Sequence, residues 1–217
     1  MTLLRVVLIT DRTLVPDDAD LVARITAIAA AVPPGSIAVQ IRDKDLDGGP
    51  MLARTRAVVA TGVPVWVNDR IDVARAAGAY GVHLPEQGLE IADARAIVNG
   101  LALGCSRHSA AAAIEATADL VQLGPIFATP GKRPIGLEPL HEARDSLAPA
   151  ITLVAVGGID SQETASLAAA AGADAVAVIR AAWTGPDPVA TIAALIAGVD
   201  DGRALRHYPL ARFPRLR

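Results

Sequence analysis

The sequence predicts an α/β protein built as a single (β/α)8 barrel, the TIM-barrel architecture. Eight short apolar runs alternate with eight alanine-rich segments that have helical spacing. Hydrophobic residues make up 52% of the 217 residues and aromatic residues only 3%, which predicts an aliphatic core of parallel strands covered by helices. Eight strand–helix units in a chain of this length favour a closed barrel.

A doubly wound open sheet is the structural alternative. Such a sheet usually has a glycine-rich dinucleotide loop after its first strand. At that position the chain has Ile9-Thr10-Asp11-Arg12, without glycine. The closed barrel is therefore the preferred interpretation.

Each element is predicted from its local pattern. Strands are expected at the apolar, β-rich runs over residues 6–10, 37–41, 64–67, 81–84, 101–105, 120–123, 152–156 and 175–179. Helices are expected over residues 18–31, 51–60, 71–77, 91–98, 109–117, 140–146, 161–171 and 188–196. Gly78 and Gly172 support this assignment, because each stands just after a predicted helix and a few residues before a β run.

Composition limits the class of protein and its location. A formal net charge of −3 argues against nucleic acid as the main partner, and the single cysteine, Cys105, excludes an internal disulfide framework. The start of the chain lacks the pattern of a signal peptide, and no apolar stretch reaches transmembrane length without charge, proline or glycine. We expect a cytoplasmic protein without a membrane partner.

The end of the chain differs from the rest in charge. We expect a barrel domain over residues 1–200 and a basic C-terminal tail over residues 201–217. The basic residues of this segment are Arg203, Arg206, His207, Arg212, Arg215 and Arg217. With few aromatic residues, the tail is expected to be solvated or to contact another subunit, which leaves a homo-oligomer open.

Polar side chains gather where the second predicted strand ends. Gln40, Arg42 and Lys44 alternate along Val39-Gln40-Ile41-Arg42-Asp43-Lys44, so they are expected to point to one face. Cations at a barrel mouth need a neutralising partner. The alternatives are an anionic ligand or a salt bridge to Asp43, Asp45 or Asp11, and the polar residues at other strand ends favour the ligand.

Asn68 and Asp69 follow the third predicted strand in the same way. Asp69 is interpreted either as the N-cap of the next helix or as a carboxylate ligand of Mg²⁺ beside a diphosphate. One carboxylate suggests a metal but does not establish it. Mg²⁺ is therefore an expected cofactor with a single ligand from the protein.

Later strand ends have features of phosphate sites. Gly157 and Gly158 follow the seventh strand and precede a helix, so their backbone N–H groups can approach phosphate oxygens, although a tight turn would also explain both glycines. The loop after the eighth strand, with Ile179 and Arg180, completes the usual phosphate position of this barrel class. The long loop over residues 124–136 is rich in proline and glycine and is expected to be a binding loop that brings Thr129 and Lys132 to a phosphate.

Two histidines lie near strand ends. A lone histidine is usually structural, but His108 is the better acid–base candidate because it follows the fifth strand, near Ser106 and Arg107. His83 ends the fourth strand. Cys105 is interpreted as a buried core residue rather than a nucleophile.

These motifs together resemble the thiamine phosphate synthase family, which includes the related thiazole tautomerases. The resemblance spans nearly the whole chain. It rests on Ile9-Thr10-Asp11, Val39-Gln40-Ile41-Arg42-Asp43-Lys44, Val67-Asn68-Asp69-Arg70-Ile71-Asp72-Val73-Ala74, Gly81-Val82-His83-Leu84, Gly104-Cys105-Ser106-Arg107-His108-Ser109, residues 123–132 and Val154-Ala155-Val156-Gly157-Gly158-Ile159.

The resemblance implies a reaction and a set of roles. Synthases of this family join a pyrimidinylmethyl diphosphate to a thiazole phosphate and release pyrophosphate with the help of Mg²⁺. By similarity, Asp69 would bind Mg²⁺ and Ser106 would face the pyrimidine. The diphosphate would lie against Gln40, Arg42, Lys44, Asn68 and Lys132, and the thiazole phosphate against Thr129, Gly157, Gly158, Ile179 and Arg180. Arg42, Lys132 and His108 are the catalytic candidates.

The chain departs from the synthase pattern at two positions. Synthases typically have a second metal-binding aspartate where this chain has Gly88, and Glu86 is the nearest acid that would replace it. They also have a small serine where this chain has Arg180. Leu84-Pro85 and Ser106-Arg107-His108-Ser109 are similar to thiazole tautomerases, which use a histidine, here His108, to move a proton on a carboxythiazole phosphate. Synthase is the first hypothesis, tautomerase the second, and a non-catalytic binder of phosphate ligands the third.

Overall fold

The structure is a computed structural model that describes residues 3–206. Eight parallel strands close into one barrel, in which each strand pairs with the next along the chain and β1 pairs with β8. The predicted fold class is confirmed. The strands are β1 (Val6–Ile9), β2 (Ile37–Ile41), β3 (Val65–Asn68), β4 (Gly81–Leu84), β5 (Ala102–Arg107), β6 (Leu120–Leu123), β7 (Thr152–Val156) and β8 (Ala175–Val178).

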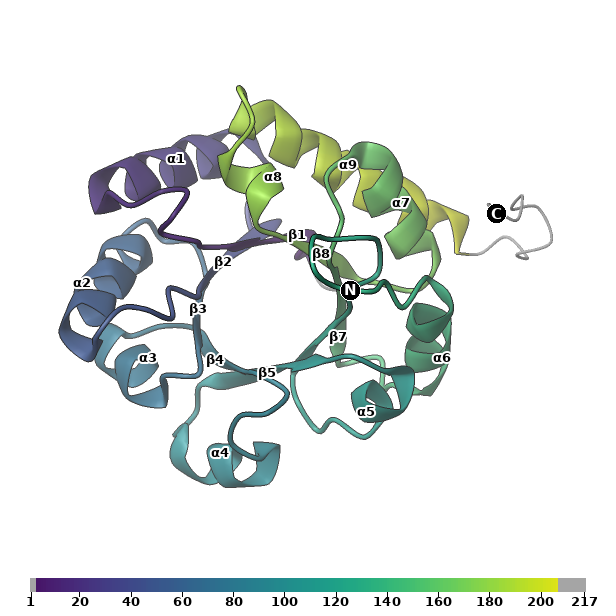
Figure 1. The fold of residues 1–217 in the computed structure, drawn as a ribbon, viewed down its shortest axis with the longest axis horizontal. Coiled ribbons are helices and arrows are strands. Elements are labelled where there is room, and N and C mark those ends of the chain that lie inside the picture. Colours follow the sequence, from purple (N-terminus) through teal and green to yellow (C-terminus); the bar gives the residue numbers. More distant parts are fainter. Residues whose placement is uncertain (1–2, 207–217) are drawn as a thin grey trace.

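The helices form an outer ring around the strands (Figure 1). Side-chain caps start several of them: Asp17 accepts a hydrogen bond from the Asp20 amide, and Ser161 and Thr164 form a capping box. The helices are α1 (Asp18–Ala31), α2 (Gly48–Val59), α3 (Ile71–Ala77), α4 (Ile91–Ile97), α5 (Ala110–Ile114), α6 (Glu138–Ser146), α7 (Gln162–Ala170), α8 (Arg180–Trp183) and α9 (Pro188–Leu205).

Several elements differ from the predicted bounds by one or more residues, and three of these differences concern the mouth or the predicted tail. β5 runs two residues further than predicted, because Ser106 and Arg107 pair with Gln122 and Leu123 of β6 despite their polarity. The four-residue helix α8 was missed, since its first residue was assigned to a loop. Helix α9 runs to Leu205 rather than residue 196, so residues 201–205 of the predicted tail lie in a helix. Residues 207–217 lie outside the described part of the chain.

The last helix is longer because it packs closely on α7. A Cβ atom at Gly198 would lie 2.3 Å from the Gln162 carbonyl oxygen, and one at Gly202 would lie 2.2 Å from the Ser166 carbonyl oxygen. Both distances are far below van der Waals contact, so only glycine allows these two backbones to approach. The helix therefore continues along its neighbour beyond the point where its own apolar pattern weakens.

The core has two separate parts. The larger part lies between strands and helices and includes Leu8, Ile25 and Leu140. The smaller part fills the barrel interior, where Trp66 is the largest side chain. A Cβ atom on Gly81 would lie 2.7 Å from the Trp66 ring, and one on Gly104 would lie 3.2 Å from it. These two glycines therefore make room for the indole inside the barrel.

Candidate active site at the carboxyl ends of the strands

The predicted site residues all lie at or just after the carboxyl end of a strand. Because the strands are parallel and the barrel is closed, these ends share one face of the molecule. Every candidate thus belongs to the same mouth, although the roles inferred for the residues stay predictions. They lie in the last residues of a strand or in the loop after it: β2 (Gln40, Arg42, Lys44), β3 (Asn68, Asp69), β5 (Ser106, His108), β6 (Thr129, Lys132), β7 (Gly157, Gly158) and β8 (Ile179, Arg180).

A layer of amide side chains lies inside the barrel just below the mouth. Gln122 Nε2 donates to Gln40 Oε1 at 2.8 Å, and Gln40 Nε2 lies 3.4 Å from Asn68 Oδ1. All three residues are buried. Gln40 and Asn68 were predicted, but Gln122 was missed. Its pattern was readable, because Gln122 stands one residue before the end of an apolar strand, as Gln40 does.

His83 and Ser106 form a second polar contact in the barrel interior. His83 Nε2 lies 2.8 Å from Ser106 Oγ. Burial, together with the positive charges of Arg42 and Arg107, lowers the pKa of His83 from 6.5 to about 3. The imidazole is therefore neutral at physiological pH, and Ser106 is held at the inner wall of the site by an uncharged partner.

The cations after β2 have no acid partner within residues 3–206. Asp43 accepts hydrogen bonds from Arg54 and Thr10, and Asp45 pairs with Arg12, so neither acid pairs with Arg42 or Lys44. The salt-bridge alternative to an anionic ligand is therefore wrong for these two acids. Strand β2 ends at Ile41, so of the three predicted residues only Gln40 lies in the strand. Arg42 follows the strand directly, and Lys44 lies on an exposed turn.

The long loop after β6 packs onto the end of β7. Phe127 N donates to the Gly157 carbonyl oxygen at 3.0 Å, and a Cβ atom on Gly158 would lie 2.7 Å from the Ala128 carbonyl oxygen. Gly157 and Gly158 also have positive φ angles of 99° and 67°. Turn geometry and loop packing together explain why both positions are glycine. The same packing places Thr129, the residue after Ala128, close to the end of β7, and a β-bridge joins Thr129 to Lys132 within the loop.

The predicted phosphate features near β7 and β8 are only partly as expected. Helix α7 begins at Gln162, and the Ser161 side chain already accepts from the Thr164 amide, so the helix end is capped by the protein. Within the described residues, the Gly158 amide has no hydrogen-bond acceptor. Arg180 begins α8, is exposed and has no acid partner in residues 3–206.

Asp69 is held in an unusual backbone conformation at the end of β3. Its φ angle is 65°, and its amide donates to the His83 carbonyl oxygen at 2.9 Å. The N-cap of α3 is Arg70, so the interpretation of Asp69 as a helix cap is wrong. Its exposed carboxylate has no hydrogen bond or ion pair within the described chain. Non-glycine residues at positive φ are often found at functional sites.

Glu86 and His108 are partners between the neighbouring loops that follow β4 and β5. Glu86 Oε2 contacts His108 Nδ1, and Glu86 Oε1 accepts from the His108 amide at 3.1 Å. The Glu86 carboxylate therefore binds His108. This geometry does not support the hypothesis that Glu86 replaces the metal-binding aspartate that is absent at Gly88. The contact to Nδ1 leaves Nε2 as the ring nitrogen available for proton transfer.

Cys105 takes no part in the polar network. It is fully buried, and burial raises the pKa of its thiol to about 11. A thiol with such a pKa is protonated at neutral pH and a poor nucleophile. The assignment of Cys105 to the core is confirmed.

The donor set fits Mg²⁺ only together with a ligand. In residues 3–206, no group of three or more His, Cys, Asp or Glu side chains is arranged to hold a metal ion. Mg²⁺ is commonly bound through one or two carboxylates plus substrate phosphates. The free Asp69 carboxylate meets this requirement when a diphosphate supplies the remaining oxygens. The site therefore fits a metal ion that binds with the substrate.

Fold and site together define a (β/α)8 barrel at whose mouth, within residues 3–206, several cations and the Asp69 carboxylate have no ion-pair partner. The chain belongs to the thiamine monophosphate synthase family, whose model matches residues 6–182. It is 40% identical over 188 residues to a thiamine-phosphate synthase of Anaeromyxobacter dehalogenans, covering 82% of this chain and 83% of that protein. It is 38% identical to a putative thiamine-phosphate synthase of Geobacter sulfurreducens, covering 80% and 85%.

Solved structures agree with the family assignment. A thiamine phosphate pyrophosphorylase from Pyrococcus furiosus superposes with a TM-score of 0.80 at 30% identity, covering 93% of this chain and 98% of that one. Orotidine 5'-phosphate decarboxylase from Pyrococcus horikoshii, at 19% identity and a TM-score of 0.67, shares the fold. Within residues 3–206, no helix has both the length and the apolar character needed to span a membrane.

Proposed function

We propose that this protein is a thiamine phosphate synthase that joins a pyrimidinylmethyl diphosphate to a thiazole phosphate and releases pyrophosphate. One observation supports this reaction most strongly: within the described chain, Arg42, Lys44 and Lys132 have no acid partner at the mouth of the barrel. A diphosphate is the multivalent anion that would neutralise them. The similarity to named synthases over most of the chain points the same way.

The cations act on the leaving group. As the bond between the pyrimidinylmethyl carbon and the diphosphate oxygen breaks, negative charge accumulates on pyrophosphate, and Arg42, Lys44 and Lys132 stabilise it. Gln40 and Asn68 orient the same group from the buried amide layer. Mg²⁺ bound with the diphosphate at Asp69 supplies further charge neutralisation when present.

The second half of the reaction needs positioning more than charge. The thiazole nitrogen forms a bond to the pyrimidinylmethyl carbon, and both rings have to be held in contact for this step. Ser106 faces the pyrimidine, while Thr129, Gly157, Gly158, Ile179 and Arg180 surround the thiazole phosphate. Neutral His83 holds Ser106 without adding positive charge beside the carbon that becomes cationic.

The test is formation of thiamine phosphate by the purified protein from both substrates with Mg²⁺. Asp69→Ala is expected to lower kcat/KM by about 100-fold or more, because the single metal-binding carboxylate is removed. Asp93→Ala is the matched control, since Asp93 is an exposed carboxylate on the outer helix α4. Wild-type protein that makes no thiamine phosphate would contradict the proposal.

The pairing of Glu86 with His108 favours a second candidate, thiazole tautomerase. A carboxylate that orients Nδ1 leaves Nε2 as a base for moving a proton on a carboxythiazole phosphate. Deuterium incorporation from D₂O into that compound, lost in His108→Asn, together with no thiamine phosphate, would replace the synthase by the tautomerase. Binding of thiazole phosphate without turnover of any substrate would instead indicate a non-catalytic relative.

The proposal includes the setting of the reaction. The partners are the two phosphorylated substrates, and the cytoplasm is the compartment in which we place the enzyme. The homo-oligomer expected as an option and the role of the basic tail stay predictions. Sedimentation velocity of the full chain would measure its oligomeric state. The same measurement on a chain ending at residue 206 would show whether the tail contributes to that state.

A further inference from the structure

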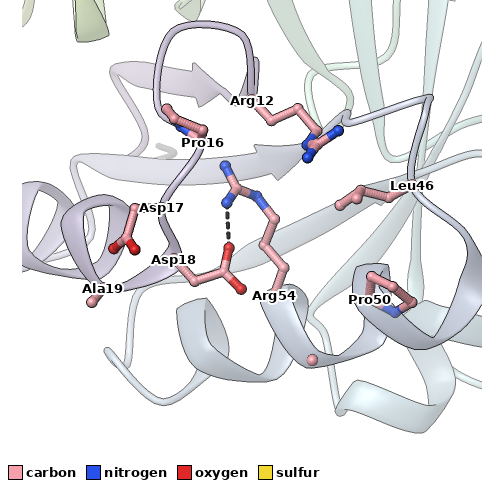
Figure 2. A pocket seen from close by; sticks show the side chains of 9 residues that line it. Arg12, Pro16, Asp17, Asp18, Ala19, Leu46, Pro50 and Arg54 are labelled. Carbon is pink, nitrogen blue, oxygen red and sulfur yellow. Dashed lines mark hydrogen bonds and ion pairs between the residues drawn. The ribbon is translucent and has the colours of Figure 1, made fainter.

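A buried ion pair lies beside the mouth, between the loops that follow β1 and β2. Arg54 of α2 is the largest fully buried side chain in residues 3–206. Its Nε donates to Asp43 Oδ2 at 2.8 Å, its Nη2 donates to the Val15 carbonyl oxygen at 2.8 Å, and its Nη1 pairs with Asp18 (Figure 2). A buried arginine is unfavourable unless its donors are engaged in this way.

Asp43 connects Arg54 to the turn that contains Arg42 and Lys44. Its Oδ2 also accepts from Thr10 Oγ1 at 2.9 Å, and its Oδ1 accepts from the Arg12 amide at 2.8 Å. Thr10 Oγ1 in turn accepts from the Arg42 amide at 2.9 Å. A continuous chain of hydrogen bonds therefore runs from the Arg54 guanidinium to the backbone of Arg42.

The same contact controls charge. Asp43 lies between Arg42 and Lys44 in the sequence and is therefore an acid adjacent to both cations. Arg54 and Thr10 bind the Asp43 carboxylate, which forms no ion pair with either cation, and both cations have no acid partner within the described chain. Arg54 thus keeps Arg42 and Lys44 free for an anion.

We propose that Arg54 and Asp43 are positioning residues for the diphosphate: they fix the turn that presents Arg42 and Lys44 and prevent Asp43 from neutralising them. This inference rests on the proposed function, because it takes the diphosphate as the ligand of Arg42 and Lys44. Neither Arg54 nor Asp43 touches the substrate. Their removal acts on the affinity for diphosphate before it acts on the thiazole site, which lies at the opposite side of the barrel, on β6 to β8.

The test compares Arg54→Met with Arg144→Met. Arg144 also pairs with a partly buried aspartate, Asp174, but at the amino end of the barrel. Titration calorimetry with inorganic pyrophosphate and Mg²⁺ is expected to show a Kd raised by about tenfold or more in Arg54→Met, since a loosened support displaces the binding groups. In Arg144→Met the Kd is expected to match wild type, even where the melting temperature falls.

Steady-state kinetics separate positioning from general damage. In Arg54→Met the KM for pyrimidine diphosphate is expected to rise by about tenfold, while the KM for thiazole phosphate changes by less than about twofold. Equal rises in both KM values, or none in a folded variant, would overturn the inference. Pyrophosphate binding is measured without turnover, so it tests the role of Arg54 separately from the reaction. If wild type binds pyrophosphate, Arg54→Met binds it more weakly and wild type makes no thiamine phosphate, only the proposed function is contradicted.

Two further variants keep the test decisive if Arg54→Met does not fold. Thr10→Val replaces the linking hydroxyl by a methyl group of similar size and is expected to weaken pyrophosphate binding in the same direction. Arg54→Ala extends a cavity of about 370 Å³ that is lined by Arg12, Asp17, Asp18, Leu46, Pro50 and Arg54 (Figure 2). Millimolar guanidinium is expected to restore binding in Arg54→Ala and to have no effect on wild type. A folded Thr10→Val with wild-type affinity would overturn the proposal.

Discussion

The two ends of the barrel both contain arginine–aspartate clusters, and they differ in what those clusters leave free. At the amino end, Asp174 pairs with Arg144 and Arg206, and the remaining donors of Arg144 bind the carbonyl oxygens of Ile151 and Leu147. At the carboxyl end, Asp43 is held by Arg54, and Arg42 and Lys132 have no acid partner within residues 3–206. The amino end pairs these charges with one another, whereas the carboxyl end leaves cations unpaired, as the proposed binding of a diphosphate requires.

The largest effect that distinguishes the two ends is on activity. Lys132→Met is expected to lower kcat/KM for thiamine phosphate formation by about 100-fold, because a positive charge facing the leaving pyrophosphate is removed. The control is Arg75→Met, which removes an exposed cation of the outer helix α3 that has no ion pair within the described chain. Steady-state kinetics of both variants measure the difference. Equal losses of activity would show that net charge, and not the mouth, is responsible.

The next effect is on stability and belongs to the amino end. Asp174→Asn leaves two partly buried guanidinium groups without their carboxylate and is expected to reduce the free energy of unfolding by about 3 kcal/mol. Urea unfolding followed by circular dichroism measures this loss. At a temperature where the variant is folded, its KM values are expected to match wild type. Raised KM values in the folded variant would show that the amino end also affects substrate binding.

A third prediction concerns pH and the barrel interior. The pKa of His83 is about 3 in the folded protein and near 6.5 in the unfolded chain, so the unfolded state binds more protons between these values. The stability associated with neutral His83 is complete above pH 6.5 and is lost as the pH falls toward 3. Between pH 7 and pH 5, this group alone is expected to lower the free energy of unfolding by about 2 kcal/mol.

His83→Gln isolates that contribution. Urea titrations of wild type and variant at both pH values give a double difference in which the carboxylates common to both proteins cancel. The variant is expected to lose less stability on acidification than wild type. An identical pH dependence in the two proteins would show that His83 is not the group responsible.

The smallest expected effect is on stability, and it compares an exposed ion pair at the amino end with the partly buried pairs of Asp174. Arg95 and Asp119 form an ion pair there at 3.0 Å, with side chains 44% and 50% exposed. Exposed pairs are screened by solvent, so Arg95→Met is expected to reduce the free energy of unfolding by less than about 1 kcal/mol. The same urea assay, run beside Asp174→Asn, measures the contrast. A loss as large as that of Asp174→Asn would show that burial does not set the strength of these pairs.

Much of the fold could be predicted because most strands and helices have a recognisable local sequence pattern. Four strands and two helices have the bounds expected from the sequence, and strand order follows from the alternation of the two kinds of element. The misses have tertiary causes. Ser106 and Arg107 extend β5 because β6 pairs with them, and α9 continues to Leu205 because Gly198 and Gly202 let it lie against α7.

The candidate site was predictable in its location but not in its internal pairing. Parallel strands bring their carboxyl ends to one face, so Gln40, Asn68 and Lys132 could be assigned to one mouth from sequence order alone. Which acid meets which base depends on loop geometry. Glu86 was considered as a metal ligand and instead contacts His108, and Asp43 was considered as a partner of Arg42 and instead binds Arg54.

The sequence by itself determined the barrel, the face on which chemistry occurs and the residue types that converge there, because hydrophobic periodicity and strand order are local properties of the chain. Only the tertiary structure decided which charges remain free. Pairing between side chains far apart in the sequence depends on distances of a few ångströms across packed loops, and no local pattern encodes them. For Arg42 and Lys44, that decision rests on Arg54, a residue that the sequence alone gave no reason to select.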